Sequence, residues 1–509
     1  MIRSSDITNA IVHLTSYAPT VLTTILGTGD ADTTYAVDFR TNHLKFSYPS
    51  RAEDCLHALL DILRRIFLPL KFLHSQCDTL TSEHGWYSCK YGKDVQSAKL
   101  PCTKHSKTET ECQPRSPLMS FLGDCLPGHL PHQLTSVGCR AECKSCPKAT
   151  PGQPCLTPLG FRGFSGSTKL GKELGNVLTK FFSNGIATPL LSFVPKPPSS
   201  LPEHFGFALY LVKGWGDGSK TAGKNGIQSY VEDAMKGQSI NLYSDTAPLT
   251  NALTKAYDDA RSTHADMKHL PPYAELASLS MRIPCYDRNQ KALCAPYLSS
   301  VCGDSYGYFA KKHANLYLSW AVYLPWTFWD LLNNLYNAFC SINCQDWGCR
   351  GCLRGDKCKK GEHGVIEDVT KPNPTCPCLS IVDCKGVAPT LYQYGFVFGE
   401  ASTLNDSQSP KKCSDFCSQL KNVLNSKYFQ KLFEECDNFL WIIRQPFIWL
   451  NVALWLLSLL YLLHIMVIRL DLLHIKSHLH SPSSHRIAAQ SLLAAGRVNK
   501  LGKVFYLQP

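Results

Sequence analysis

The sequence predicts a mainly α-helical, single-pass membrane protein with disulfide-rich irregular modules in a large ectodomain and one C-terminal transmembrane helix. Two observations predict this class. An apolar stretch from Phe447 to Ile468 contains no acidic or basic side chain other than His464. All 24 cysteines lie between Cys55 and Cys436, so the apolar stretch and the residues after it have none. Cysteines confined to one side of a membrane helix indicate a disulfide-permissive compartment on that side.

The stretch 447–468 has the length and composition of a membrane span. At about 1.5 Å per residue, 22 helical residues cover the hydrocarbon core of a bilayer. Its 14 Leu, Ile, Val and Phe residues favour insertion by about 4–8 kcal/mol in total, and Asn451, Ser458 and His464 subtract from that sum. The alternative is a buried helix of a soluble protein, but such helices are usually shorter and interrupted by charge.

The charge after this stretch predicts the orientation. Residues 469–509 hold six lysines and arginines against the single acid Asp471. Positively charged flanks stay in the cytoplasm, so 469–509 is predicted to be a basic cytoplasmic tail and 1–445 to lie outside the cytosol. The formal charge of +12 leaves only a scattered excess elsewhere, which is poor evidence for nucleic-acid binding. The basic tail suits anionic membrane lipid.

The N-terminal segment, residues 1–54, carries no clear signal peptide. Polar residues such as His13, Thr15 and Pro19 interrupt its apolar run where an uninterrupted core is needed. The sequence leaves three alternatives open: an unusual export route, an incomplete gene model, or a membrane helix that itself acts as the address.

Cysteine distribution predicts three further segments. Residues 55–155 form a Cys-rich module, 156–284 a Cys-free and mainly helical module, and 285–440 a second Cys-rich module with a membrane-proximal helix. Most of the cysteines are expected to be disulfide-bonded within their own group, with a connectivity that sequence cannot give.

Several stretches have helical periodicity. Residues 55–74 form an amphipathic helix that Pro69 is expected to end or kink. A second helix is expected from near Ser167 or Thr168, with Leu174 and Leu178 on one face, and helical patterns resume over 247–281. Cys413 and Cys417 share a helix face with Phe416, Leu420 and Leu424. Leu316–Trp329 is too short to span and is split by Pro325, so it is a buried helix or an interfacial patch.

Four motifs bear on chemistry. Cys139, Cys143, Cys146 and Cys155 have zinc-ligand spacing, but two disulfides are favoured by the predicted compartment. Cys344, Cys352, Cys358 and His363 nearly fit a CCCH zinc finger, with a last gap one residue too long.

Gly166-x4-Gly171-Lys172 is continued by Glu173 where a P-loop needs Ser or Thr, so we reject a phosphate site. Gly303–Gly307 matches G-x-S-x-G without the strand that a nucleophile elbow needs.

One sequon for N-glycosylation is present at Asn405-Asp406-Ser407. A second candidate at Asn373 is excluded because Pro374 follows it. The sequon lies in the segment that is predicted to be outside the cytosol.

Three stretches resemble the variant erythrocyte surface antigens of intraerythrocytic piroplasm parasites: PLMSFLGDCLPGHLPHQLTSVGCRAECKSCPKATPGQPCLTPLGFRGFSGSTKLGKEL (117–174), PEHFGFALYLVKGW (202–215) and LDLLHIKSHLHSPSSHRIAAQSLLAAGRVNKLGKVFYLQP (470–509). The resemblance covers a little over a fifth of the chain. It implies a Cys-rich ectodomain, one C-terminal membrane helix and a short tail, exported without a conventional signal peptide. It also implies antigenic variation and adhesion of infected red cells, and it brings no catalytic residues.

Two classes of function follow. The leading hypothesis is a non-enzymatic parasite surface antigen and adhesin in the infected-erythrocyte or plasma membrane, with membrane lipid and a host receptor or partner antigen subunit as its partners. It needs no cofactor, no catalytic residue and no metal ligand, and it binds no nucleic acid. The alternative is an intracellular CCCH-type zinc-binding, RNA-binding protein that uses Cys344, Cys352, Cys358 and His363.

Overall fold

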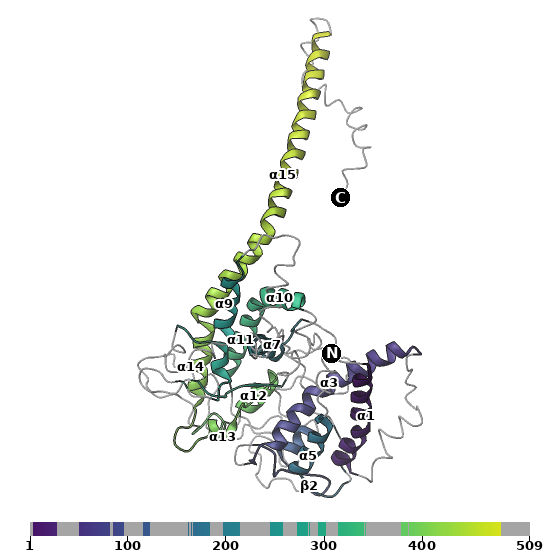
Figure 1. Cartoon of the computed structure of the whole chain (residues 1–509), viewed down its shortest axis with the longest axis vertical. Helices are drawn as coiled ribbons and strands as arrows, with labels where there is room; N and C mark the ends of the chain where they lie inside the picture. The colour runs from purple at the N-terminus through teal and green to yellow at the C-terminus, as the bar shows by residue number, and fades with distance from the viewer. Residues whose placement is uncertain are drawn as a thin grey trace, which may run out of the picture. The chain divides into compact units, whose positions relative to one another are not determined.

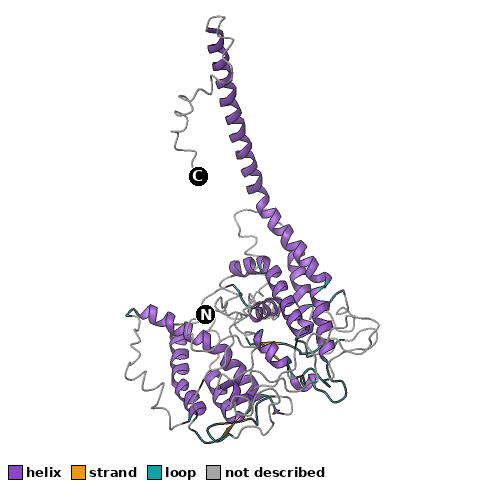
Figure 2. Cartoon of the chain, turned by 180° about the vertical axis from the view of Figure 1, so that it is seen from behind, coloured by secondary structure: helices purple, strands orange, loops and turns teal. Residues whose placement is uncertain are grey.

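The computed structural model of the chain describes sixteen stretches of residues: 4–27, 50–81, 85–95, 116–122, 161, 164, 166–183, 197–213, 245–257, 272–282, 285, 294–301, 314–340, 342, 378–384 and 386–479. These residues are mostly helical, as predicted, and the strands among them are short (Figures 1 and 2). They divide into two compact units, Met1–Phe439 and Leu440–Pro509.

The first helices of unit Met1–Phe439 pack into one core. Helices α1 (Ser4–Leu26) and α3 (Ala52–Asp78) both pack on α5 (Gly171–Phe182) (Figure 1). Short α4 (Pro117–Leu122) lies against the two-residue strand β1 (Lys90–Tyr91), which pairs antiparallel with β2 (Lys169–Leu170). The predicted segments 55–155 and 156–284 therefore share a core through α3 and α5.

Helix α1 uses a helical apolar stripe to join this core. Ala10, Leu14, Val21 and Ile25 are buried and recur at helical spacing. Thr15 and Ser16, two of the polar residues that interrupt the apolar run, are exposed on the other side of the helix. Their hydroxyls donate hydrogen bonds to backbone carbonyls three or four residues earlier. The segment between residues 4 and 26 is thus an amphipathic core helix.

Helix α3 passes through Pro69, and helix α5 begins after its expected first residue. Helix α3 does not end at Pro69, because it continues to Asp78 with Phe72, Leu73 and Cys77 buried. Burial of these side chains stabilises the turn after the proline and offsets its missing N–H. Helix α5 begins at Gly171, a few residues after the expected start, and buries Leu174 and Leu178 as expected.

The other helices that the structure describes wholly within unit Met1–Phe439 form a second group. It contains α7 (Leu201–Lys213), α9 (Ala247–Tyr257), the 3-10 helix η4 (Leu276–Leu279), α10 (Ala314–Tyr323), α11 (Pro325–Cys340), α12 (Val387–Gln393), α13 (Ala401–Leu404) and α14 (Cys413–Leu424). Strands β3 (Ser299–Ser300) and β4 (Phe396–Val397) pair antiparallel, with Ser299 opposite Val397.

Tyr392 of α12 connects this second group to the first core. Its ring lies 3.9 Å from the ring of Phe72, measured between centroids, and 5.8 Å from that of Phe121. Phe72 and Trp86 complete the aromatic cluster with an edge-to-face contact at 5.6 Å. Aromatic pairs at these distances add to the stabilisation that burial gives.

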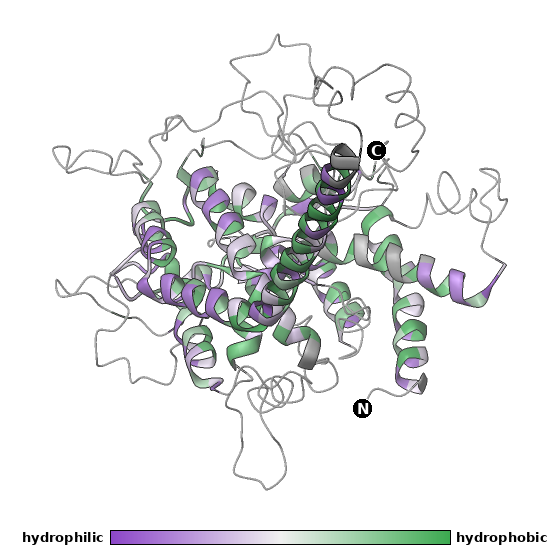
Figure 3. Cartoon of the chain, turned by 90° about the horizontal axis from the view of Figure 1, so that it is seen from above, coloured by the Kyte–Doolittle hydropathy of each residue, from purple (hydrophilic) through white to green (hydrophobic). Residues whose placement is uncertain are grey.

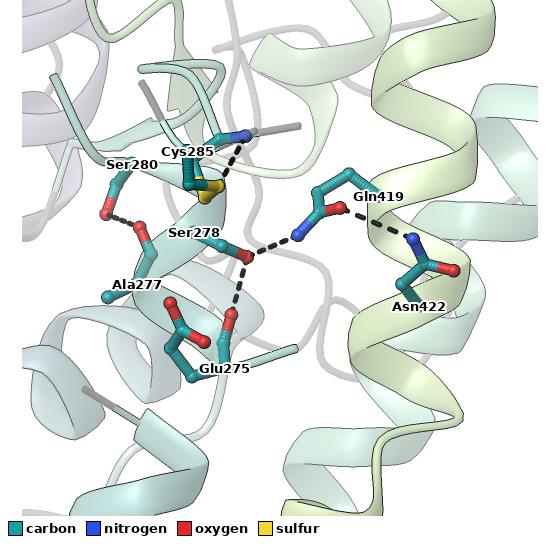
Figure 4. The surroundings of a disulfide bond; sticks show 8 residues. Glu275, Ala277, Ser278, Ser280, Cys285, Gln419 and Asn422 are labelled. Carbon is teal, nitrogen blue, oxygen red and sulfur yellow. Dashed lines mark hydrogen bonds between the residues drawn. A yellow bond between two sulfur atoms is a disulfide. The ribbon is translucent and has the colours of Figure 1, made fainter. Parts of the chain in front are cut away.

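A disulfide between Cys285 and Cys294 lies beside η4 (Figure 4). Their Cα atoms are 5.0 Å apart, a usual separation for a disulfide. Next to it, Gln419 of α14 donates to the hydroxyl of Ser278, which donates in turn to the carbonyl of Glu275. These three residues are fully buried, and their hydrogen bonds hold η4 against α14.

Unit Leu440–Pro509 is described only for the larger part of α15 (Lys427–Leu479), which begins in the first unit. The N-terminal turns of this helix bury Phe429, Leu432, Cys436 and Phe439 in the first unit. From Leu440 onward the helix continues to Leu479. Figure 3 shows that apolar residues cover much of its length.

Candidate membrane anchor and interaction surface

Helix α15 carries its apolar side chains on the outside. Trp455 is 70% exposed and Leu457 61%, in the middle of the stretch predicted to span a membrane. Exposed large apolar side chains continue from Phe447 to Leu473. Soluble proteins rarely expose an apolar surface of this extent, because each exposed side chain forfeits the free energy of burial.

Among the described residues, one helix is long and apolar enough to cross a membrane, and it contains this stretch. Its uncharged part is bounded by exposed ionic side chains, Arg444 before it and Arg469 after it. Trp441 and Trp449 are exposed near its start, where amphipathic rings suit the interface between lipid and water.

Asn451 is a polar side chain within the apolar stretch, and the helix itself satisfies part of its hydrogen-bonding capacity. Its Nδ2 donates to the carbonyl of Phe447 at 2.8 Å, one turn earlier. A buried or lipid-exposed amide costs less when it is hydrogen-bonded, so this contact lowers the penalty of placing Asn451 in hydrocarbon. The sequence alone predicts only that Asn451 makes the free energy of membrane insertion less favourable.

The stretch Leu316–Trp329 is mainly core. It forms α10 and the start of α11, separated at Pro325 as expected, because proline is favoured in the first turn of a helix. Tyr317, Val322 and Phe328 are buried, and the half-buried Trp329 donates its indole N–H to the carbonyl of Leu424 at 2.8 Å. Tyr323 is the large side chain left exposed, at 51%.

The sequon at Asn405 lies on an accessible loop. Asn405 follows α13, and the residues from Asp406 to Ser409 are exposed. The carboxylate of Asp406 accepts a hydrogen bond from the backbone N–H of Gln408 at 3.2 Å, which shapes the loop as an Asx turn.

The rejected P-loop pattern has a clear structural role. Gly171 and Lys172 begin α5, and the carboxylate of Glu173 accepts a hydrogen bond from the N–H of Leu170 at 3.2 Å. An acidic side chain therefore stabilises the N-terminus of the helix, and its charge would repel a phosphate there.

The described cysteines are mostly buried. Burial raises the pKa of Cys89 to about 11 and that of Cys436 to about 12. Thiols with such pKa values stay protonated at neutral pH and are poor nucleophiles. The helix face expected for α14 is confirmed, with Cys413, Phe416, Cys417, Leu420 and Leu424 buried.

The other predicted chemistry lies outside the described residues. This holds for the zinc-finger alternative Cys344, Cys352, Cys358 and His363, for the four cysteines 139, 143, 146 and 155, and for the motif 303–307. Within the described stretches, no group of three or more His, Cys, Asp or Glu side chains is placed to hold a metal ion.

A comparison of the chain with protein-family models, with curated proteins and with solved structures found no match.

Proposed function

We propose that the chain is a surface antigen of an intraerythrocytic piroplasm parasite, anchored by 447–468 and displayed on the infected red cell. The exposed apolar surface of α15 carries this proposal, because a surface of that length and composition is stable in a bilayer and unfavourable in water. The resemblance of segments 117–174, 202–215 and 470–509 to variant erythrocyte surface antigens supplies the family.

The arrangement of the ectodomain supports an adhesive and antigenic role. A framework of buried helices joined by exposed loops tolerates sequence change in the loops, as antigenic variation requires. The loop 405–410 between α13 and α14 is one such loop. The partners would be a host cell-surface receptor or a partner antigen subunit, together with membrane lipid.

Adhesion would be carried by loops rather than by the aromatic stretch 316–329. The indole N–H of Trp329 donates a hydrogen bond to the carbonyl of Leu424. The ring of Trp320 packs edge-to-face against that of Tyr317, with centroids 5.3 Å apart. Side chains held in this way stabilise α10 and α11 and present little surface to a partner.

A binding experiment tests the proposal. Oxidised full-length protein in lipid nanodiscs is applied to cultured endothelial cells, and bound protein is measured by flow cytometry. We expect saturable binding that is lost on reduction and alkylation, with no hydrolysis of ester or nucleotide substrates. Empty nanodiscs are the control. Hydrolysis that is abolished by Ser305→Ala, a change of the serine in the 303–307 motif, would indicate an enzyme rather than an adhesin. Stoichiometric zinc would favour the CCCH alternative.

A further inference from the structure

Cys340 and Cys417 meet in the core of unit Met1–Phe439. Cys340 is the last residue of α11, and Cys417 lies one turn into α14. Their sulfur atoms are 2.9 Å apart, although the residues are 77 positions apart in the sequence. Both side chains are buried, with exposed fractions of 9% for Cys340 and 3% for Cys417.

The packing of α11 on α14 fixes this proximity independently of the sulfur atoms. Phe339 and Phe416, the residues immediately before the two cysteines, make an edge-to-face contact with ring centroids 4.6 Å apart. At the other end of the helix pair, Trp329 donates to the carbonyl of Leu424. The two contacts show that the helices run antiparallel and hold the cysteines opposite each other.

The distance between the sulfur atoms is close to that of a covalent bond. A disulfide has a bond length of about 2.05 Å, so closure requires the two sulfur atoms to approach by about 0.9 Å. The same approach is also compatible with a weak S–H···S hydrogen bond between two thiols. The chemical environment decides between these two states.

We propose that Cys340 and Cys417 form a disulfide that ties α11 to α14 in the mature protein. This disulfide rests on the proposed function, because a surface antigen exposes unit Met1–Phe439 to an oxidising compartment. The oxidant is a disulfide, such as that of a thiol–disulfide oxidoreductase or oxidised glutathione. One cysteine thiolate attacks the oxidant and releases a thiol, and the second thiolate then attacks the mixed disulfide. Two protein thiols lose two electrons and two protons, and the oxidant becomes two thiols.

The surroundings of the pair indicate when the bond forms. The hydrogen bond with Cys340, followed by burial, raises the pKa of Cys417, and burial together with the two cysteines raises the pKa of the neighbouring Tyr336. A protonated, buried thiol reacts slowly. The bond would therefore form while α11 and α14 are still accessible during folding, and it would then be shielded from reductants.

Peptide mapping tests the proposal on the full-length chain. Native membrane protein is treated with N-ethylmaleimide during lysis, so that free thiols are blocked, and is then digested with chymotrypsin without reduction. Cleavage after Phe339 and Phe416 gives peptides that begin with Cys340 and with Cys417. We expect these two peptides as one species with the mass of both less two hydrogens, and fragment ions between Cys340 and Cys344 assign the linked residue.

A second sample tests whether the two cysteines pair in a defined oxidising buffer, independently of the cellular compartment. Purified, reduced, full-length protein in detergent is equilibrated with an excess of oxidised glutathione, quenched and mapped in the same way. Linkage in both samples supports the proposal. If Cys340 and Cys417 are alkylated or linked to other cysteines in the glutathione sample, the pairing is wrong. If they are linked there and alkylated in the native sample, the compartment is reducing, and both the mature bond and the proposed ectodomain placement are rejected.

Variants provide the matched control. Cys340→Ser should leave Cys417 free and add one alkylated thiol at that peptide. Cys436→Ser, which also removes a fully buried cysteine, should leave the linked peptide unchanged. Loss of the linked peptide in Cys436→Ser would show that the pairing depends on the general integrity of the core and would overturn the assignment.

Discussion

Gln419 donates a hydrogen bond from its side-chain amide to the hydroxyl of Ser278 at 2.8 Å, and the two residues are 141 positions apart in the sequence. Both side chains are fully buried, and the hydroxyl of Ser278 donates onward to the carbonyl of Glu275 at 2.6 Å. This contact holds η4, with the disulfide beside it, against α14 (Figure 4).

Replacing Gln419 by Met should therefore destabilise unit Met1–Phe439. The change leaves Ser278 without its donor and Asn422 without its acceptor, and an unsatisfied buried polar group costs about 1–3 kcal/mol. The measurement is the free energy of unfolding from urea titration of full-length protein in detergent. Gln430→Met, at an exposed position of α15, is the matched control and should change that free energy by less than about 0.5 kcal/mol. Equal stability of the two variants would refute the structural role of the contact.

Trp329→Phe should destabilise the protein without affecting adhesion. The indole N–H is lost from the carbonyl of Leu424, in the last turn of α14 where carbonyls lack intrahelical donors, at a cost of about 1–3 kcal/mol. Thermal unfolding and cell binding of the same preparation are compared. The control Thr327→Ala changes an exposed side chain on α11 and should alter neither property. A Trp329→Phe variant with normal stability and weakened binding would restore 316–329 as the adhesive patch.

Stability should fall on acidification because of His204. Burial lowers the pKa of His204, against smaller raising effects from the carbonyl of Ser200 and the charge of Glu203. The unfolded chain then binds a proton more tightly than the folded chain, so stability rises with pH and is lost as the pH falls below the unfolded value of about 6.5. His74, whose pKa burial also lowers, acts in the same direction.

The urea midpoint measured between pH 5.5 and 7.5 checks this expectation. His204→Gln should flatten the dependence, and Gln430→Met, which changes no titratable group, should leave it unchanged. A dependence that survives in the His204→Gln variant with its full slope would assign the effect to other groups.

Two arginines in the centre of the apolar stretch should prevent membrane integration. In Leu457→Arg/Leu460→Arg each arginine costs about 2.5–3.5 kcal/mol at the centre of a span, and two together offset most of the favourable 4–8 kcal/mol. The readout is the fraction of full-length protein that resists alkaline extraction from microsomes. Leu457→Ala/Leu460→Ala should stay integrated. Equal extraction of the two double variants would indicate that the helix does not enter the bilayer.

Local patterns predicted the elements whose signal is contained in their own sequence. The apolar composition of 447–468 indicated the exposed part of α15, and the spacing of Cys413, Phe416 and Leu420 indicated the buried face of α14. Helix α1 has the same kind of signal in the spacing of Ala10 and Leu14, but the polar residues that argue against a signal peptide obscure it.

Contacts between distant segments could not be predicted in this way. The hydrogen bond from Gln419 to Ser278 and the approach of Cys340 to Cys417 depend on how α14 packs against η4 and α11, which no spacing within one segment encodes. The aromatic stretch 316–329 illustrates the same limit, because composition alone does not distinguish a core helix from an adhesive patch. The packing of neighbouring helices determines which of the two it is, through contacts such as the hydrogen bond from Trp329 to Leu424.

Two epitope tags, one on each side of 447–468, report the orientation of this segment in the membrane. One epitope tag is inserted between Ser407 and Gln408, in the exposed loop after α13, and a second follows Pro509. Intact cells that express the full-length chain are stained before and after permeabilisation. We expect the loop tag to be stained on intact cells and the C-terminal tag to be stained only after permeabilisation. Staining of both tags only after permeabilisation, or of the C-terminal tag alone on intact cells, would contradict this expectation.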